Sequence, residues 1–262
     1  MFRASASDAV AKRHNNGVDV KRVGVVDVGS NSVRLVVYDV VGRSIQQRLN
    51  EKVLAGLGRG LGETGRLNPE GVQSAMRALF RFKAITRAQH VEDVTAFATA
   101  AVREAEDGAA FCARVREETG LSLRVLSGED EARYAGYGVL AIRPDADGIA
   151  GDLGGSSLEL SGLSGGYYVG GRTYPLGPLA LETYGAPGSN EVAGAIHSAL
   201  TGAPELSIGA RTFFAVGGAW RALARLEMER RDYPLRILQN YEIDADRVHR
   251  LVERVLDPDE RT

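Results

Sequence analysis

A short pattern occurs twice in this chain, each time between two runs of apolar residues. The first copy, "DVGSNSVRL", begins at Asp27, and the second, "DLGGSSLEL", begins at Asp152, 125 residues later. Both have an aspartate, a glycine two positions on and a serine three positions after that. Apolar runs on either side of a small polar turn predict a β-hairpin. Two matched hairpins indicate an internal duplication, so we expect two lobes with related cores.

Between and after the hairpins, helix and strand patterns alternate. Asn68 is expected to cap a helix that runs to about residue 87, and Gly120 to end another. Ser127, with Asp130 three residues later, predicts the start of a helix that continues to about residue 141. We expect further strands at residues 94–99, 121–127, 167–174 and 212–218. The alternation predicts a mixed α/β fold.

Composition excludes several classes of protein. The chain is 44% hydrophobic and 25% charged, and no apolar run reaches the roughly 18–20 residues of a membrane helix. A net charge of −2 gives no general attraction to DNA. The single cysteine, Cys112, excludes an internal disulfide and favours a reducing compartment. Residues 1–21 have no apolar core of the secretory type, so we expect a disordered leader on a cytoplasmic protein.

The hairpin turns are candidate phosphate sites. Small turn residues let a ligand approach the backbone, where consecutive N–H groups and serine hydroxyls form an anion nest. An ordinary hairpin is the alternative for either copy alone, and the matched pair argues against it. Neither turn is a Walker A or dinucleotide motif. The candidate residues, with a third glycine turn between a strand and a helix, are Gly29, Ser30, Asn31, Ser32, Gly154, Gly155, Ser156, Ser157, Gly217 and Gly218.

Acidic residues stand beside these turns. Asp27, Asp152 and Glu159 offer hard oxygen ligands that suit Mg²⁺ shared with substrate phosphates. The alternative for the two aspartates is that each caps its own turn. Glu159 is two positions after Ser157 in an alternating strand, so both side chains are expected on one face.

A second group of acids opens the helix after Ser127. From spacing alone Glu129, Asp130 and Glu131 are equivalent, and acids in a first turn ordinarily interact with the helix dipole. Arg103 follows a strand and is a candidate to reach an anion in a cleft between the two hairpins, and an exposed arginine is the alternative. The four histidines are isolated in the sequence, which argues against zinc hydrolysis and Ser/His catalysis.

Four ordered motifs together resemble the exopolyphosphatase and guanosine pentaphosphate phosphohydrolase (Ppx/GppA) family of the actin-like ATPase superfamily. They are "DVGSNSVRLVVYD", "ATAAVREAED", "LRVLSGEDEARYAGYGVL" and "DLGGSSLELSGL", with "FFAVGGAWRALA" in the place of the family's glycine turn in the second lobe. The resemblance covers about residues 23–242. It implies two ribonuclease-H-like lobes, expected at residues 22–141 and 142–262. The second is expected to be incomplete, because the family's last strand and helix have no counterpart.

The resemblance also implies a chemistry. It assigns Glu131 as the base that activates water, Arg103 to phosphate, and Asp152 and Glu159 to Mg²⁺. The reaction is hydrolysis of the terminal phosphoanhydride of polyphosphate, or of guanosine pentaphosphate, and a homodimer is allowed. Ser156 departs from the family's pattern, which has a glycine there. Two alternatives stay open: a sugar- or acetate-kinase-like phosphotransferase, and a binding protein without catalysis.

Overall fold

The structure is a computed structural model that describes residues 20–42, 44–207 and 211–256. The expected leader lies almost wholly outside the described residues. The strands are β1 (Lys21–Val28), β2 (Ser32–Val41), β3 (Ser44–Leu54), β4 (Asp93–Ala98), β5 (Leu123–Val125), β6 (Gly148–Leu153), β7 (Leu158–Ser164), β8 (Tyr167–Tyr174) and β9 (Phe213–Gly217). The helices are α1 (Leu61–Thr64), α2 (Pro69–Ala88), α3 (Ala100–Glu104), α4 (Gly108–Thr119), α5 (Gly128–Ile142), α6 (Pro178–Leu181), α7 (Asn190–Leu200), α8 (Gly218–Arg230) and α9 (Ala245–Leu256), with a 3-10 turn at Pro204–Ser207.

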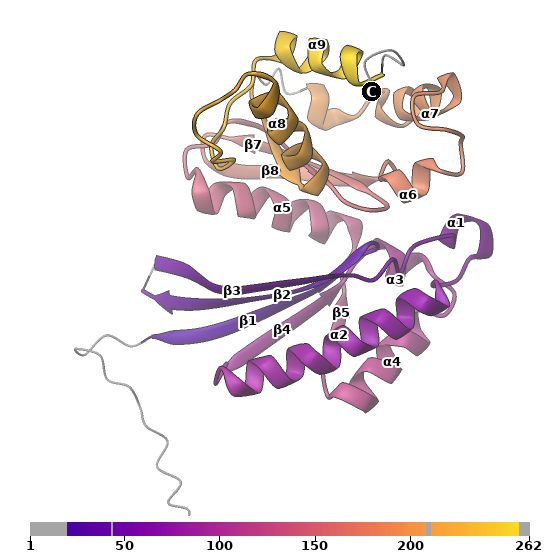
Figure 1. The fold of residues 1–262 in the computed structure, drawn as a ribbon, viewed down its shortest axis with the longest axis vertical. Helices are drawn as coiled ribbons and strands as arrows, with labels where there is room; N and C mark the ends of the chain where they lie inside the picture. Colours follow the sequence, from indigo (N-terminus) through magenta and orange to yellow (C-terminus); the bar gives the residue numbers. More distant parts are fainter. Residues whose placement is uncertain (1–19, 43, 208–210, 257–262) are drawn as a thin grey trace, which may run out of the picture.

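Two sheets organise the chain into two lobes (Figure 1). Within the described residues the first sheet has the order β3-β2-β1-β4-β5 and the second the order β8-β7-β6-β9. In each sheet the first hairpin is antiparallel, and its first strand also pairs in parallel with a later strand, β4 or β9. This correspondence confirms the predicted mixed α/β fold with two sheets, and it agrees with an internal duplication.

The first lobe buries one face of its sheet under α2 and α4 (Figure 1). Alternation along β1 and β2 places Val26, Val28 and Leu35 in this core, where Leu79 and Phe82 of α2 meet them. Helix α2 begins where the sequence predicts, because the Asn68 side chain accepts a hydrogen bond of 2.8 Å from the backbone of the third helical residue. The opposite face of the sheet looks toward the second lobe.

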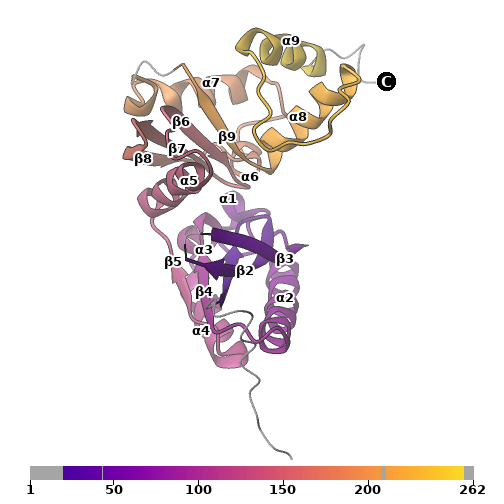
Figure 2. The same cartoon turned by 90° about the vertical axis from the view of Figure 1, so that its left-hand side faces the viewer.

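Helix α5 crosses between the two sheets (Figures 1 and 2). It packs on the second sheet so closely that a methyl group added at Gly136 would lie 3.0 Å from the ring of Tyr168. Tyr134 on its other side meets Phe97 of β4, with 5.7 Å between ring centroids. Helix α5 therefore packs mainly on the second sheet, and the lobe boundary after residue 141 stays a prediction.

One strand is shorter than the sequence predicts. Strand β5 covers only Leu123–Val125, because Leu126 already leaves the strand and Ser127 caps α5. Among the helices that the structure describes, none is both long and apolar enough to cross a membrane.

Candidate functional site

The two predicted turns have the same internal geometry. In the first, the N–H of Gly29 donates to the carbonyl of Ser32 at 2.9 Å. In the second, the N–H of Gly154 donates to the carbonyl of Ser157 at 2.8 Å. The matched pattern of the sequence thus corresponds to a matched hydrogen bond.

Neighbouring loops bind the carbonyl groups of the first turn. The carbonyl of Ser30 accepts from the N–H of Gly58 at 2.8 Å, and that of Asn31 accepts from Gly56 at 3.0 Å. These donors belong to the loop that follows β3, the third strand of the lobe. The carbonyl groups of Ser30 and Asn31 therefore both have hydrogen-bond donors within the protein.

The second turn repeats this arrangement. The carbonyl of Gly155 accepts from Leu179 at 2.9 Å, and that of Ser156 accepts from Gly177 at 3.1 Å. These donors again follow the third strand of the lobe, here β8. Each turn is thus held in place by the hydrogen bonds that its backbone carbonyl groups accept.

The backbone N–H groups of the two turns differ from the carbonyl groups. In the part of the chain that the structure describes, the N–H groups of Ser30, Asn31, Gly155 and Ser156 donate to no protein acceptor. Ser30 and Ser156 are buried, and a buried donor without an acceptor is costly. A methyl group added at Gly155 would lie 3.2 Å from the N atom of Asn31, so the two turns touch. Together they can donate hydrogen bonds to an anion.

Gly58 is a site residue that the sequence analysis missed. A methyl group there would lie 3.1 Å from the Cβ of Ser30 and 3.2 Å from the Oγ of Ser156. Gly58 thus stands where both turns meet. The only signal in the sequence is its place in the glycine-rich stretch "LGRGLG".

Gly177 offers a test of how the second turn is positioned. A methyl group at this residue would lie 2.4 Å from the backbone of Ser156, so Gly177→Ala is expected to displace the turn. We expect a loss of about 1–3 kcal/mol of unfolding free energy, measured by urea denaturation, together with loss of activity. The matched control is Gly194→Ala in α7, where no atom lies within 4 Å and the substitution is expected to be neutral or slightly stabilising. Equal stability of the two variants would contradict this role for Gly177.

The structure distinguishes the three acids that open α5. Ser127 caps this helix by accepting from the N–H of Asp130 at 3.1 Å, as predicted. The carboxylate of Asp130 forms ion pairs with Arg124 and Arg133. Glu129 is exposed. Glu131 alone turns inward, with its side chain only 9% exposed.

Arg103 at the end of α3 contacts Glu131. Its guanidinium donates to the Glu131 carboxylate and, at 2.9 Å, to the carbonyl of Leu126. Burial raises the pKa of Glu131 to about 7, and the negative charges of Glu159 and Asp27 add to this, while Arg103 lowers it. A carboxyl group with a pKa near neutrality is suited to take a proton from water.

Three further carboxylates surround this pair. Asp152 lies opposite Glu159 across β6 and β7, and Glu159 is buried and accepts from the hydroxyl of Thr173 at 2.8 Å. Burial is the main cause that raises the pKa of both. Asp27 is exposed, yet the surrounding protein and the charge of Asp152 raise its pKa to about 6. The four acids are therefore electrostatically coupled, and a cation would relieve their repulsion.

The acidic side chains near the turns indicate how a metal ion could be bound. In the described ranges, no three carboxylate, imidazole or thiol side chains gather closely enough to surround an ion by themselves. Mg²⁺ usually takes only one or two carboxylates and completes its shell with water and phosphate oxygens. That mode of binding needs only one or two of Asp27, Asp152 and Glu159 as direct ligands, and the assignment of all three stays a prediction.

The predicted glycine turn of the second lobe also lies at this site. Gly217 has a φ of 109°, and a methyl group there would lie 2.9 Å from Oδ1 of Asp152. Only glycine adopts this conformation readily, and α8 begins directly after it. Gly218 is the first residue of that helix, so its N–H is one of the free donors of a helix start.

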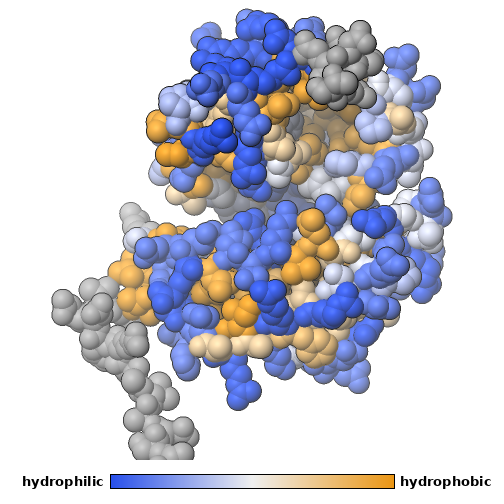
Figure 3. All heavy atoms as spheres, viewed as in Figure 1, coloured by the Kyte–Doolittle hydropathy of each residue, from blue (hydrophilic) through white to orange (hydrophobic). Residues whose placement is uncertain are grey.

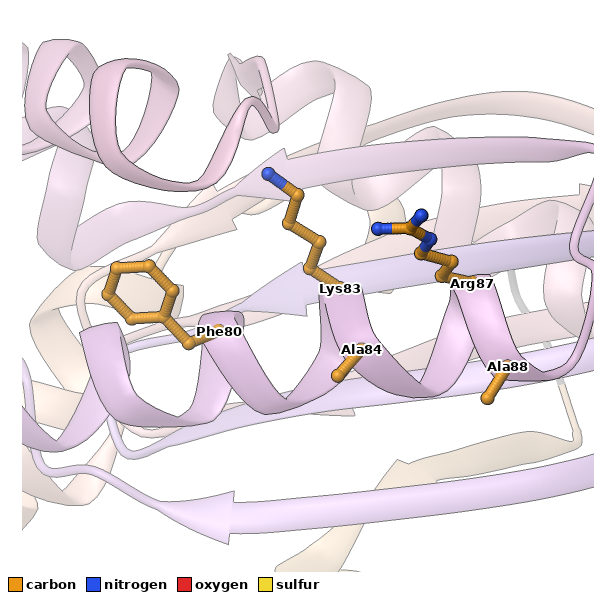
Figure 4. Close-up of a pocket in the computed structure, with 5 residues that line it drawn as sticks. All are labelled: Phe80, Lys83, Ala84, Arg87 and Ala88. Carbon is orange, nitrogen blue, oxygen red and sulfur yellow. The ribbon is translucent and has the colours of Figure 1, made fainter. Parts of the chain in front are cut away.

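The surface is hollowed between the two lobes (Figure 3). A separate depression lies on the outer side of α2, away from the turns, and is lined by Phe80, Lys83, Ala84, Arg87 and Ala88 (Figure 4). These residues all belong to one helix that covers the far face of the first sheet. None of the predicted site residues is among them.

Comparison with known proteins agrees with this arrangement. A family model described as the Ppx/GppA phosphatase family matches residues 36–262. The chain belongs to the Ppx/GppA phosphatase family. The crystal structure of the Aquifex aeolicus family member is 30% identical, with a TM-score of 0.67, and the match covers 83% of this chain and 72% of that one. An exopolyphosphatase from Cytophaga hutchinsonii shares the fold, with a TM-score of 0.74 at 24% identity, over 82% of this chain and 72% of that one.

Two curated exopolyphosphatases are also similar in sequence. Exopolyphosphatase 1 of Mycobacterium tuberculosis is 36% identical over 146 residues, which are 53% of this chain and 42% of that protein. Exopolyphosphatase 2 of the same organism is 30% identical over 150 residues, which are 53% and 47% of the two chains. The chain thus spans about half the length of the curated relatives it matches.

Proposed function

We propose that this protein hydrolyses the terminal phosphoanhydride bond of inorganic polyphosphate with Mg²⁺ and releases phosphate. The observation that carries the proposal is the pair of touching turns with free N–H groups beside the Glu131–Arg103 pair. The names of the mycobacterial relatives support polyphosphate as the substrate class.

Each group has a role in the proposed reaction. The N–H groups of both turns and the Arg103 guanidinium bind the terminal phosphate. The Glu131 carboxylate takes a proton from a water molecule, whose oxygen then forms a bond to the terminal phosphorus. The bridging P–O bond breaks, and its electron pair stays with the shortened chain. The N–H groups stabilise the charge on the phosphoryl oxygens in the transition state.

Asp27, Asp152 and Glu159 would hold the Mg²⁺ ion. When bound, the ion would neutralise negative charge on the substrate phosphates. The three carboxylates fit this task because they are coupled and partly dehydrated. Thr173 and Ser157 orient Glu159 through hydrogen bonds to its carboxylate.

The proposal predicts metal-dependent release of phosphate. With polyphosphate and Mg²⁺ the full chain is expected to release phosphate, and excess EDTA is expected to abolish release, because the coupled carboxylates would repel the substrate. The measurement is a colorimetric phosphate assay, with restoration by added Mg²⁺ as the control. Asp152→Asn is expected to raise the Mg²⁺ concentration needed for half-maximal rate. Release that persists in EDTA would contradict the role of the metal, and binding of polyphosphate without release would indicate a non-catalytic protein.

Guanosine pentaphosphate is the alternative substrate within this proposal. It offers the same bond at the end of a shorter phosphate chain, and the description of the matching family includes GppA. Comparison of kcat/KM for guanosine pentaphosphate and polyphosphate distinguishes the two. We place the reaction in the cytoplasm, in keeping with a chain that has one cysteine.

A further inference from the structure

Lys52 lies on the face of the first sheet that looks toward the second lobe. The strand registers set Phe97, Asp27, Arg34 and Lys52 in one row across β4, β1, β2 and β3. Side chains of one row share a face of the sheet. Phe97 meets Tyr134 of α5 there, which fixes this face as the inner one.

The two cations of this row differ in their partners. Arg34 donates to the side-chain carbonyl of Asn50 at 2.8 Å. Lys52 is exposed and forms no hydrogen bond or ion pair within the described residues. It nevertheless lies near enough to Asp27 to lower the pKa of that carboxyl. Lys52 is thus a cation beside the site that no protein group neutralises directly.

In the second lobe, Arg221 is the cation beside the strand-end aspartate Asp152. It is in the first turns of α8, four residues after Gly217, which touches Asp152. Arg221 is exposed and, like Lys52, has no hydrogen bond or ion pair among the residues that the structure describes. Its charge lowers the pKa of Asp152. Each strand-end aspartate therefore has one available cation beside it.

We propose that Lys52 and Arg221 bind substrate phosphates beyond the one that is removed, and so select polyanionic chains over short phosphates. This inference rests on the proposed function. The terminal phosphate already has the turns and Arg103, whereas the following phosphates bring further negative charge close to four carboxylates. Exposed cations, one from each lobe, offset that repulsion.

The test compares two variants with two matched controls in the full chain. Lys52→Ala and Arg221→Ala remove the proposed contacts. Lys83→Ala removes a lysine from the outer side of α2, and Arg225→Ala removes an arginine one helical turn farther from Asp152. The melting temperature of each variant verifies folding.

We expect each of the two variants to raise KM for long-chain polyphosphate about 5-fold and the double variant about 20-fold or more, with kcat changed less than about 2-fold. For tripolyphosphate, which has only two phosphates beyond the one removed, the rise in KM is expected to be smaller. The dependence of KM on salt should weaken in the double variant. Equal effects on both substrates, or effects no larger than those of the controls, would overturn the inference.

Direct binding keeps this test independent of catalysis. Titration of the full chain with long-chain polyphosphate in the presence of Mg²⁺ gives a Kd, which is expected to rise in the same variants. If the native chain releases no phosphate, the proposed reaction fails, and the Kd values still decide the role of Lys52 and Arg221. An unchanged Kd in the double variant would overturn it.

Discussion

Replacement of Glu131 by glutamine is expected to lower kcat for phosphate release by about 10²–10⁴-fold, because the amide cannot take the proton from water. The change leaves the shape of the side chain nearly intact. The matched control is Glu129→Gln, two residues earlier in the same turn of α5, where the side chain is exposed. The control is expected to keep full activity. An unchanged rate for Glu131→Gln would mean that another group is the base.

The dependence of kcat on pH is expected to follow the ionisation of Glu131. The base must be ionised, and Glu131 has a pKa of about 7, so the rate is expected to rise as pH increases through this region. A cation bound at the neighbouring carboxylates would lower this pKa and move the rise to lower pH. In Glu131→Gln the remaining rate should lose this rise. The measurement is kcat between pH 5 and 9 at saturating substrate.

Stability gives a readout that does not involve catalysis. The pKa of Glu131 is raised from 4.5 to about 7, so the folded protein holds a proton that the unfolded chain releases. Its contribution to stability is complete below pH 4.5 and is lost as pH rises through 7. In EDTA at pH 8, Glu131→Gln is expected to be more stable than the native chain by about 1–3 kcal/mol in urea denaturation. If Glu131→Gln is no more stable than the native chain, burial of the ionised Glu131 carboxylate does not destabilise the fold.

The second large effect is expected for Arg103→Ala. This change removes a charged contact to the substrate phosphate and is expected to lower kcat/KM by about 10²-fold. It also removes the positive charge that lowers the pKa of Glu131, so the rise of kcat with pH should move to higher pH. Arg103→Lys should restore part of the activity, because it keeps the charge without the bidentate geometry.

The control for this change is Arg114→Ala on α4. Arg114 forms an exposed ion pair with Glu118 within the same helix and lies in neither turn. Its removal is expected to change neither the rate nor the pH profile. If the dependence of kcat on pH is the same for Arg103→Ala and the native chain, Arg103 does not influence the pKa of Glu131, which would contradict their coupling.

Much of the fold was predictable because its causes are local. The hairpins at Asp27 and Asp152 follow from apolar alternation and small turn residues, and α5 begins at Ser127 because its side chain caps the helix. The length of β5 and the sheet on which α5 packs were not predictable. Both depend on which distant surface the residues meet, as when Gly136 packs against Tyr168.

The candidate site was likewise predictable from the sequence only in part. Spacing left Glu129, Asp130 and Glu131 equivalent, and the resemblance to the family chose among them. The structure supplies a physical reason, since only Glu131 is buried against Arg103. Gly58 and Lys52 have no motif of their own, and Arg221 lies in the motif around Gly217 without being singled out by it. Only the neighbours of these residues in the folded chain reveal their places at the site.

The sequence by itself determined the two matched turns, the alternation of strands and helices, and the family. Such features depend on the order of residues within a few positions, where backbone conformation and apolar periodicity act. Only the tertiary structure decided that Gly155 lies against Asn31, that the carbonyls of both turns are bound by neighbouring loops, and that their N–H groups stay available. The physical reason is that burial and electrostatic coupling arise between residues more than a hundred positions apart, and these exist only once the two lobes have packed together.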